Sequence, residues 1–185
     1  MKIGLIGGSF NPPHVGHLLA AQYVWATQPL DAVWLLPSFR HPFGKPLEAY
    51  AHRVAMCEAL CADTSGWLSV SREESNVPGE GRTVDVLEHL AGKFPQEAFS
   101  WVMGSDIIAD LPYWKDFERI KALARVLVIH RAGHPHPSAL GPPLAEVSST
   151  VIRERLKQGA SVDDCVPRRV VEYIRQNGLY ATGPE

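Results

Sequence analysis

The chain has 185 residues, a formal net charge of -2 and 21 % charged residues. A chain of this length buries roughly 70 % of its unfolded surface in one core, so we expect a single domain over residues 1–185. The lysines and arginines are dispersed, which argues against a protein that binds nucleic acid by phosphate neutralisation alone and leaves small anionic ligands as candidates. The sequence contains no run near the ~20 apolar residues of a membrane span and no signal-peptide pattern. These features predict a cytoplasmic protein without nucleic-acid or membrane partners.

Apolar runs and helical periodicities alternate along the chain. Buried-type strands are predicted at residues 2–6, 32–36, 67–71, 99–103 and 125–129. Helices are predicted between them, at residues 18–25, at 49–62, from a cap at Thr83 through Ala91, and at 114–123, which resumes after Pro112. This alternation predicts an α/β fold, a doubly wound parallel sheet of about five strands with helices on both faces.

The alternation of strands and helices is interrupted after residue 130. Residues 131–144 contain four prolines and two glycines, which predicts an irregular surface loop. Two C-terminal helices should follow. One is opened by Ser148-Ser149-Thr150, and the other has Pro167 near its start and Gly178 just past its end.

The three cysteines, Cys57, Cys61 and Cys165, are odd in number and lack metal-site spacing, so we expect free thiols. Cys57 and Cys61 share a helical face with Val54, which favours packing. His130, His134 and His136 have no acidic or cysteine neighbour in the pattern of a zinc site, and we predict none there.

The stretch from Gly7 to His17 joins the first strand to the first helix, where backbone amides attract anions. It lacks the Gly-Lys-Ser/Thr ending of a Walker loop, and it does not meet the G-x-G-x-x-G pattern of a dinucleotide-binding turn. His14 and His17 are three residues apart, so they share a face of the first turn and can donate hydrogen bonds to phosphate oxygens. Gly16 removes a side chain that would block the approach. This arrangement indicates nucleotidyl transfer.

The segment Gly8-Ser9-Phe10-Asn11-Pro12-Pro13-His14-Val15-Gly16-His17 resembles the signature of the His-x-Gly-His nucleotidyltransferases. Further segments, in order, narrow the resemblance to the bacterial nicotinate-nucleotide adenylyltransferases. They are residues 82–87, 104–106, 111–114, 131–133, 148–153 and 173–180. The resemblance spans most of the chain and implies a Rossmann-like nucleotidyltransferase fold with C-terminal helices.

The resemblance implies a reaction in which the phosphate of nicotinate mononucleotide attacks the α-phosphorus of ATP, giving nicotinate adenine dinucleotide and pyrophosphate in NAD synthesis. No protein nucleophile is required, and Mg²⁺, held mainly by the ATP phosphates, neutralises the leaving group. The catalytic residues would be His14, His17 and Arg153. The ATP contacts implied are Gly8, Ser9, Phe10, His14, His17, Ser148, Ser149 and Arg153.

On the acceptor side, the resemblance implies that Trp114 stacks on the pyridine ring and that the Thr83 region recognises its substituent. Lys45 and Arg131 complete the implied acceptor contacts. Asp106 either lies near the ribose or the metal, or caps the next helix. The chain departs from the family pattern in the loop 37–45, where the usual asparagines are missing and Gly44 replaces a histidine, and at Arg82, where a tyrosine is typical.

Three alternatives stay open at this point. Two are related adenylyltransferases, one acting on nicotinamide mononucleotide and one on phosphopantetheine. The third is a sensor of the same fold that binds nucleotide without reacting. A fragment of a class I aminoacyl-tRNA synthetase is disfavoured, because the second signature loop and an RNA-binding appendage are missing. The sequence leaves open whether the protein is a homo-oligomer.

Overall fold

The structure is a computed structural model that describes residues 1–40 and 47–181. The first half contains β1 (Lys2–Gly8), α1 (Val15–Thr27), β2 (Ala32–Pro37), α2 (Tyr50–Cys61), β3 (Leu68–Val70), the 3₁₀ helix η1 (Glu73–Asn76) and α3 (Thr83–Lys93). The second half contains β4 (Ala98–Gly104), the 3₁₀ helix η2 (Ser105–Tyr113), α4 (Phe117–Leu123), β5 (Ala124–Arg131), β6 (Leu140–Leu144), α5 (Ser149–Lys157) and α6 (Arg168–Gln176). The predicted strands and most of the predicted helices are confirmed.

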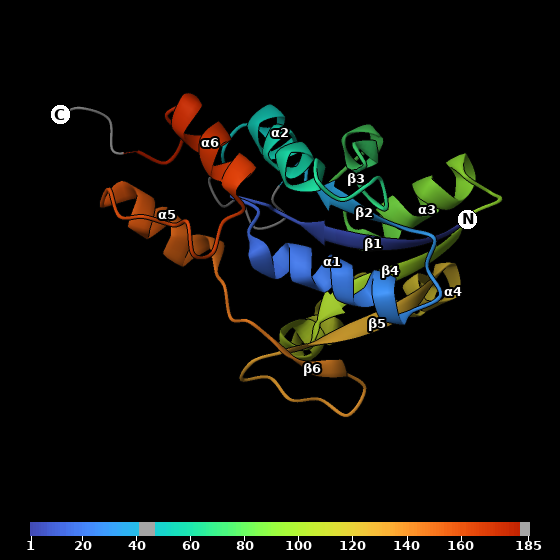
Figure 1. The fold of residues 1–185 in the computed structure, drawn as a ribbon. Helices are drawn as coiled ribbons and strands as arrows, with labels where there is room; N and C mark the ends of the chain where they lie inside the picture. The colour runs from blue at the N-terminus through green and yellow to red at the C-terminus, as the bar shows by residue number, and fades with distance from the viewer. Residues whose placement is uncertain (41–46, 182–185) are drawn as a thin grey trace.

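One parallel sheet forms the centre of the molecule (Figure 1). Its strand order is β3-β2-β1-β4-β5-β6, so the chain builds outward from β1 to β3 and then returns to the other side of β1. The order therefore reverses between β1 and β4. In open α/β sheets the crevice at such a reversal, outside the carboxyl ends of the strands, is where ligands bind.

The sheet has six strands, so the prediction of about five strands is wrong, as is the prediction of an irregular loop through residue 144. In β6, Leu140 pairs with Ile129 and Leu144 with Arg131, with a register shift between the two pairs. Gly141, Pro142 and Pro143 stand between the two leucines and break the apolar run by which a strand is recognised. An edge strand tolerates prolines because one side of its backbone needs no ladder hydrogen bonds.

Helices cover both faces of the sheet, as predicted. Along β5, Leu127 and Ile129 belong to a core with apolar side chains of α1, α2, α5 and α6. Val128, which points to the opposite face, belongs to a second core with α3 and α4. This alternation explains why the strand is apolar at nearly every position.

Two local predictions are wrong. Thr83 does not cap α3: it is the first helical residue, and Arg82 stands at the cap position with extended backbone and no side-chain cap bond. The helix predicted to begin at Trp114 begins at Phe117. There Asp116 accepts a hydrogen bond from the Arg119 amide at 3.0 Å, so the chain uses the nearest side chain able to cap.

The cysteine prediction is confirmed: all three cysteines are free and Cys57 is buried. Within residues 1–40 and 47–181, no helix is long and apolar enough to cross a membrane.

Candidate active site

The loop from Ser9 to Pro13 leaves the carboxyl end of β1 and is held by buried polar contacts. Arg53 is 2 % exposed, and its guanidinium donates to the carbonyls of Ser9 and Glu48, both at 2.9 Å. The Asn11 side-chain oxygen accepts from the Tyr180 hydroxyl at 2.8 Å and from the Glu48 amide at 3.2 Å. Sequence reasoning missed these supports, because Arg53 and Tyr180 lie far along the chain and carry no local signal.

His14 and His17 open α1 with their ring centroids 3.8 Å apart, and Phe10 lies beneath them with its ring 4.8 Å from that of His17. The backbone N–H of His14 donates to Nδ1 of His17 at 3.2 Å. An imidazole that accepts at Nδ1 carries its proton on Nε2 when neutral. His17 therefore presents an N–H donor on the side of the ring away from the His14 backbone.

Both imidazoles are neutral at pH 7. Burial lowers the pKa of His14 to about 4, and the charge of Arg131 acts in the same direction. Burial, His14 and Arg131 together hold the pKa of His17 well below its usual value. Neutral imidazoles can hydrogen-bond a phosphate without delivering a proton to it.

The start of α5 is tied directly to the β1 loop. The Ser149 hydroxyl donates to the Pro12 carbonyl at 2.9 Å, and the Arg153 guanidinium donates to the Asn11 carbonyl at 2.7 Å. The Ser148 hydroxyl caps the helix by accepting from the Thr150 amide at 3.3 Å, as predicted. The side chain of Ser149 is thus engaged by the protein. The Arg153 guanidinium also donates to the Thr150 hydroxyl at 3.3 Å and is part of the cleft lining.

Arg131 is the last residue of β5, and Asp106 follows β4 at the same edge of the sheet. The Arg131 guanidinium lies 3.8 Å from the Asp106 carboxylate, while the Arg131 amide donates to the Ser105 hydroxyl at 2.9 Å. Gly104 has no room for a side chain, because an added Cβ would collide with the Asp106 carboxylate and would lie 2.9 Å from Cγ of Arg131. The missing side chain at Gly104 thus leaves space for the Arg131 and Asp106 side chains to approach each other.

These elements enclose a cleft of about 310 Å³. It brings together seven of the predicted ATP contacts and Arg131; its lining includes Ser9, Phe10, His14, His17, Arg131, Ser148, Ser149 and Arg153. The charged side chains in this lining are arginines, and no carboxylate is among them. Two guanidinium groups, two imidazoles and the start of a helix suit a polyphosphate. Gly8 closes β1 directly below this loop.

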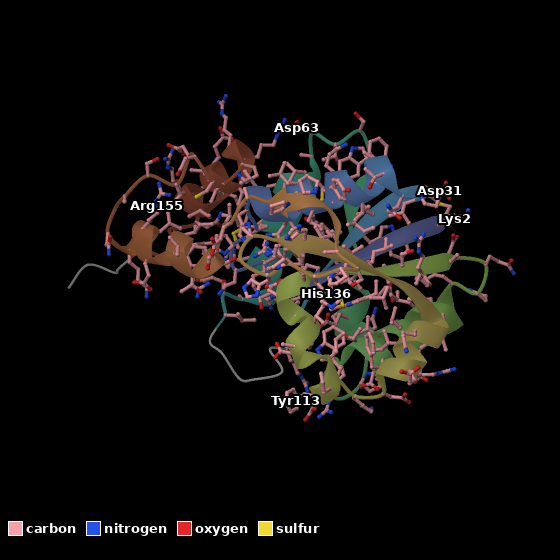
Figure 2. The ribbon with its side chains drawn as sticks, turned by 90° about the horizontal axis from the view of Figure 1, so that it is seen from below. Lys2, Asp31, Asp63, Tyr113, His136 and Arg155 are labelled. Atoms are coloured by element: carbon pink, nitrogen blue, oxygen red, sulfur yellow. The ribbon has the colours of Figure 1, made fainter. Side chains whose placement is uncertain are left out.

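Two predicted acceptor residues lie outside this cleft. Thr83 begins α3 on the opposite face of the sheet. Trp114 directly follows η2, with its ring 6.3 Å from that of Phe117, at 90°. Trp114 is partly buried, whereas its neighbour Tyr113 is 87 % exposed and projects from the surface (Figure 2). Lys45 lies outside the described residues.

A buried carboxyl group that sequence reasoning missed contacts the chain just after β2. Glu74 is 6 % exposed and accepts a hydrogen bond from the Phe39 amide at 3.0 Å. Burial raises the pKa of Glu74 to about 7, against the opposing effects of this hydrogen bond and of Arg53. Glu74 therefore connects η1 to the segment that follows β2.

Known proteins resemble this chain over nearly its whole length. The cytidylyltransferase-like family matches residues 5–155. A protein of Myxococcus xanthus named "probable nicotinate-nucleotide adenylyltransferase" is 58 % identical over 97 % of this chain and 95 % of its own, and a protein of that name from Thermus thermophilus is 39 % identical over 97 % and 100 %.

A solved structure has the same fold. It is titled as nicotinic acid mononucleotide adenylyltransferase of Plasmodium falciparum complexed with NaAD, with a TM-score of 0.79, 19 % identity and coverage of 97 % of each chain. The chain thus combines a cleft of histidines and arginines at the carboxyl edge of its sheet with high sequence identity to these relatives. It belongs to the nicotinate-nucleotide adenylyltransferase family within the cytidylyltransferase-like proteins.

Proposed function

We propose that the protein transfers the adenylyl group of ATP to nicotinate mononucleotide, giving nicotinate adenine dinucleotide and pyrophosphate. The observation that carries the proposal is the neutral pair His14 and His17, which opens a helix opposite Arg153 in a cleft lined by arginines. The names of the relatives support the choice of reaction, and the structural neighbours titled as complexes with NaAD and with APC support a nucleotide ligand at this fold.

In the proposed reaction the protein positions and stabilises rather than attacks. The acceptor phosphate oxygen forms the new bond to the α-phosphorus while the bond to the β-phosphate breaks and pyrophosphate leaves. Nε2–H of His17, fixed by the His14 amide, donates to oxygen on the transferred phosphoryl group, where negative charge develops. Arg153 holds the β and γ phosphates, with the Ser148 and Ser149 amides as further donors.

We propose Mg²⁺ as the cofactor, held mainly by the ATP phosphates. The residues fit this role for the ion, because Arg131, Arg153 and the two imidazoles line a cleft that suits the phosphates which would carry it. When bound, the ion would neutralise charge on the leaving pyrophosphate. Asp106 is the acidic side chain beside Arg131, at 3.8 Å, and its carboxylate is available to a ribose or to the ion.

We propose the acceptor site on the other side of the β1 to β4 reversal. Trp114 would stack on the pyridine ring, amides near Thr83 would recognise the carboxylate, and Arg131 with Lys45 would bind the mononucleotide. Amide donors suit a nicotinate, since a carboxylate only accepts hydrogen bonds whereas a carboxamide also donates. All these groups would then act from one domain and one edge of its sheet.

The test is acceptor-dependent release of pyrophosphate. The protein is incubated with ATP, Mg²⁺ and one of nicotinate mononucleotide, nicotinamide mononucleotide or phosphopantetheine. We expect the fastest release with nicotinate mononucleotide. Absence of turnover with both pyridine mononucleotides would overturn the proposal, and ATP binding without any product would favour a sensor.

A further inference from the structure

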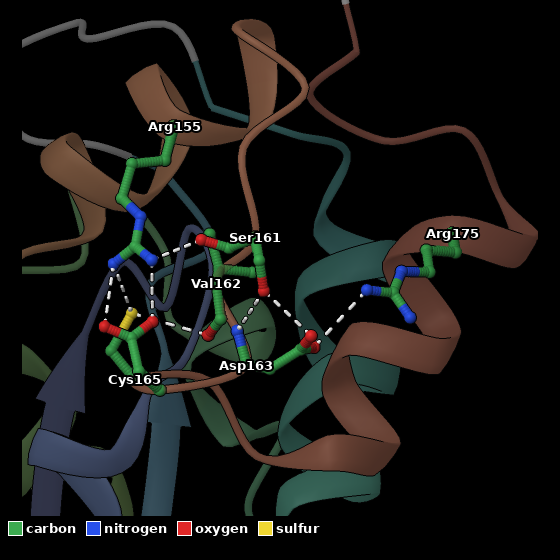
Figure 3. Close-up of polar contacts among 7 residues, drawn as sticks. Arg155, Ser161, Val162, Asp163, Cys165 and Arg175 are labelled. Atoms are coloured by element: carbon green, nitrogen blue, oxygen red, sulfur yellow. Dashed lines mark hydrogen bonds and ion pairs between the residues drawn. The ribbon is translucent and has the colours of Figure 1, made fainter.

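The segment from Ser161 to Cys165 connects α5 to α6 and is fixed from both sides by arginines (Figure 3). From α5, Arg155 forms a two-point contact with the Asp164 carboxylate, at 2.7 and 3.0 Å. The same guanidinium donates to the Ser161 carbonyl and lies 3.6 Å from the Cys165 sulfur. A planar guanidinium that meets a carboxylate at two points fixes its orientation as well as its position.

From α6, Arg175 contacts the same segment at a different point. Its guanidinium lies 3.3 Å from the Asp163 carboxylate, which also accepts from the Ser161 hydroxyl at 2.8 Å. Arg175 thus contacts Asp163, whereas Arg155 contacts Asp164 and Cys165. The two arginines are therefore similar in type and location but differ in what they hold.

The C-terminal end of this segment is hydrogen-bonded to the start of α1. The Cys165 carbonyl accepts a hydrogen bond from the Val15 amide at 3.0 Å. Val15 is the first residue of α1, and its N–H is one of the amides that lack a partner within the helix. His14 precedes it and His17 lies in the same turn. The Cys165 carbonyl thus supplies the acceptor for the first amide of α1.

Arg155 also lies two residues from Arg153 on α5, so the two side chains leave the helix on nearly opposite sides. Arg153 lines the cleft, whereas Arg155 binds Asp164 in the segment 161–165, which contacts the start of α1. One helix therefore carries a proposed triphosphate ligand and also contacts the segment that hydrogen-bonds to the start of α1. A single ATP must meet both groups at once, so their separation matters for the transition state.

We propose that Arg155 is a positioning residue: by holding Asp164 and Cys165 it fixes the first turn of α1, and with it His14 and His17, relative to Arg153. Its part in turnover rests on the proposed adenylyl transfer. Its part in ordering the histidines is independent of that reaction and is tested separately.

The kinetic test compares Arg155→Met with the matched control Arg175→Met. We expect Arg155→Met to lower kcat about tenfold with KM for ATP changed less than about threefold, because misplacement of the donors acts on the transition state. Arg175→Met should leave kcat within about twofold. Arg155→Lys keeps a charge near Asp164 and should restore part of kcat. Equal losses in the two methionine variants, or none in either, would overturn the proposal.

The second test follows the His17 imidazole by ¹⁵N NMR in protein without substrates. In the wild type and in Arg175→Met we expect an acceptor at Nδ1 and an N–H at Nε2. In Arg155→Met we expect loss of this single pattern, because the His14 amide no longer stays in place. If Arg155→Met fails to fold, Asp164→Asn serves instead, since it removes the charge with little change in shape.

An unchanged His17 pattern in the Arg155 or Asp164 variant overturns the positioning role. A wild type that shows the expected pattern but no transfer to nicotinate mononucleotide counts against the proposed function alone. The two failures are thereby distinguishable.

Discussion

The ammonium group of Lys115 lies 2.8 Å from the carboxylate of Asp85. Asp85 is in the first turn of α3, which begins at Thr83, and Lys115 directly follows Trp114. The ion pair thus joins the two elements that we propose to recognise the pyridine ring, although they are 30 residues apart along the chain.

We expect Lys115→Met to raise KM for nicotinate mononucleotide at least about threefold while KM for ATP stays unchanged. The expected change in melting temperature is small, because exposed ion pairs contribute little to stability. Steady-state kinetics with each substrate varied in turn measures this. Lys121→Met, which removes the partner of Glu118 on α4, is the control and should change neither constant.

His17→Ala should bind ATP and lose at least about a hundredfold in kcat, the range that follows removal of one preorganised donor. His136→Ala, an exposed histidine of the loop before β6, is the control and should retain full activity. ATP binding is measured by calorimetry and turnover by pyrophosphate release. Unchanged turnover in His17→Ala would refute its assigned role.

Gly16→Ala should separate stability from activity. An added Cβ would lie 3.0 Å from Nδ1 and 3.1 Å from Cε1 of His14, so the imidazole must shift. The helix itself favours alanine over glycine by roughly 1 kcal/mol, which offsets the crowding. We expect a melting temperature near that of the wild type and a kcat lowered about tenfold. Gly92→Ala, where the added Cβ meets open space, should retain kcat.

Protonation of His14 should lower the stability of the protein in mild acid. Its pKa is about 4 in the native state and 6.5 in the unfolded chain, so the unfolded chain binds more protons between these values. The free energy of unfolding should therefore fall as the pH drops from about 6.5 to 4, by about 3 kcal/mol from this group. Urea unfolding of the wild type and His14→Gln at several pH values measures it. The difference between the two proteins should change with pH in this window, and a constant difference would contradict the assignment.

Glu74 should give the stability a pH dependence of the opposite sign. Its pKa is raised to about 7, so the native state binds more protons than the unfolded chain between about 4.5 and 7. Its contribution to stability is present in acid and is lost as the pH rises through 7. Glu74→Gln keeps an acceptor for the Phe39 amide without the charge. The wild type should lose stability relative to Glu74→Gln on going from pH 5 to pH 8, and equal pH profiles would contradict a buried titrating carboxyl.

Much of the fold could be predicted from the sequence because the buried strands are apolar at successive positions. Strand β5, with Val126 to Ile129 all apolar, is an example. Strand β6 was missed because its apolar contacts come only from the leucines at its ends. The predicted start of α4 at Trp114 is wrong because Asp116, two residues further on, forms the cap.

Only those residues of the site that stand in short local motifs could be predicted from the sequence. His14, His17, Ser148, Ser149 and Arg153 stand in two short segments, and the structure brings these segments into one cleft. Arg53, Glu74 and Tyr180 support the loops through contacts between distant parts of the chain, and no spacing in the sequence records such contacts. Thr83 and Trp114 lie outside that cleft, so their assignment to the acceptor remains a prediction.

The strands at the two ends of the sheet have a further consequence for the protein in solution. An exposed edge strand can pair with another chain and start aggregation. At one edge, β3 has only three residues, and at the other, Pro142 and Pro143 leave two of the five positions of β6 without an N–H donor. Neither edge thus offers a long, continuous row of backbone donors to an added strand, and at β6 the cause is the same pair of prolines that interrupts its apolar pattern.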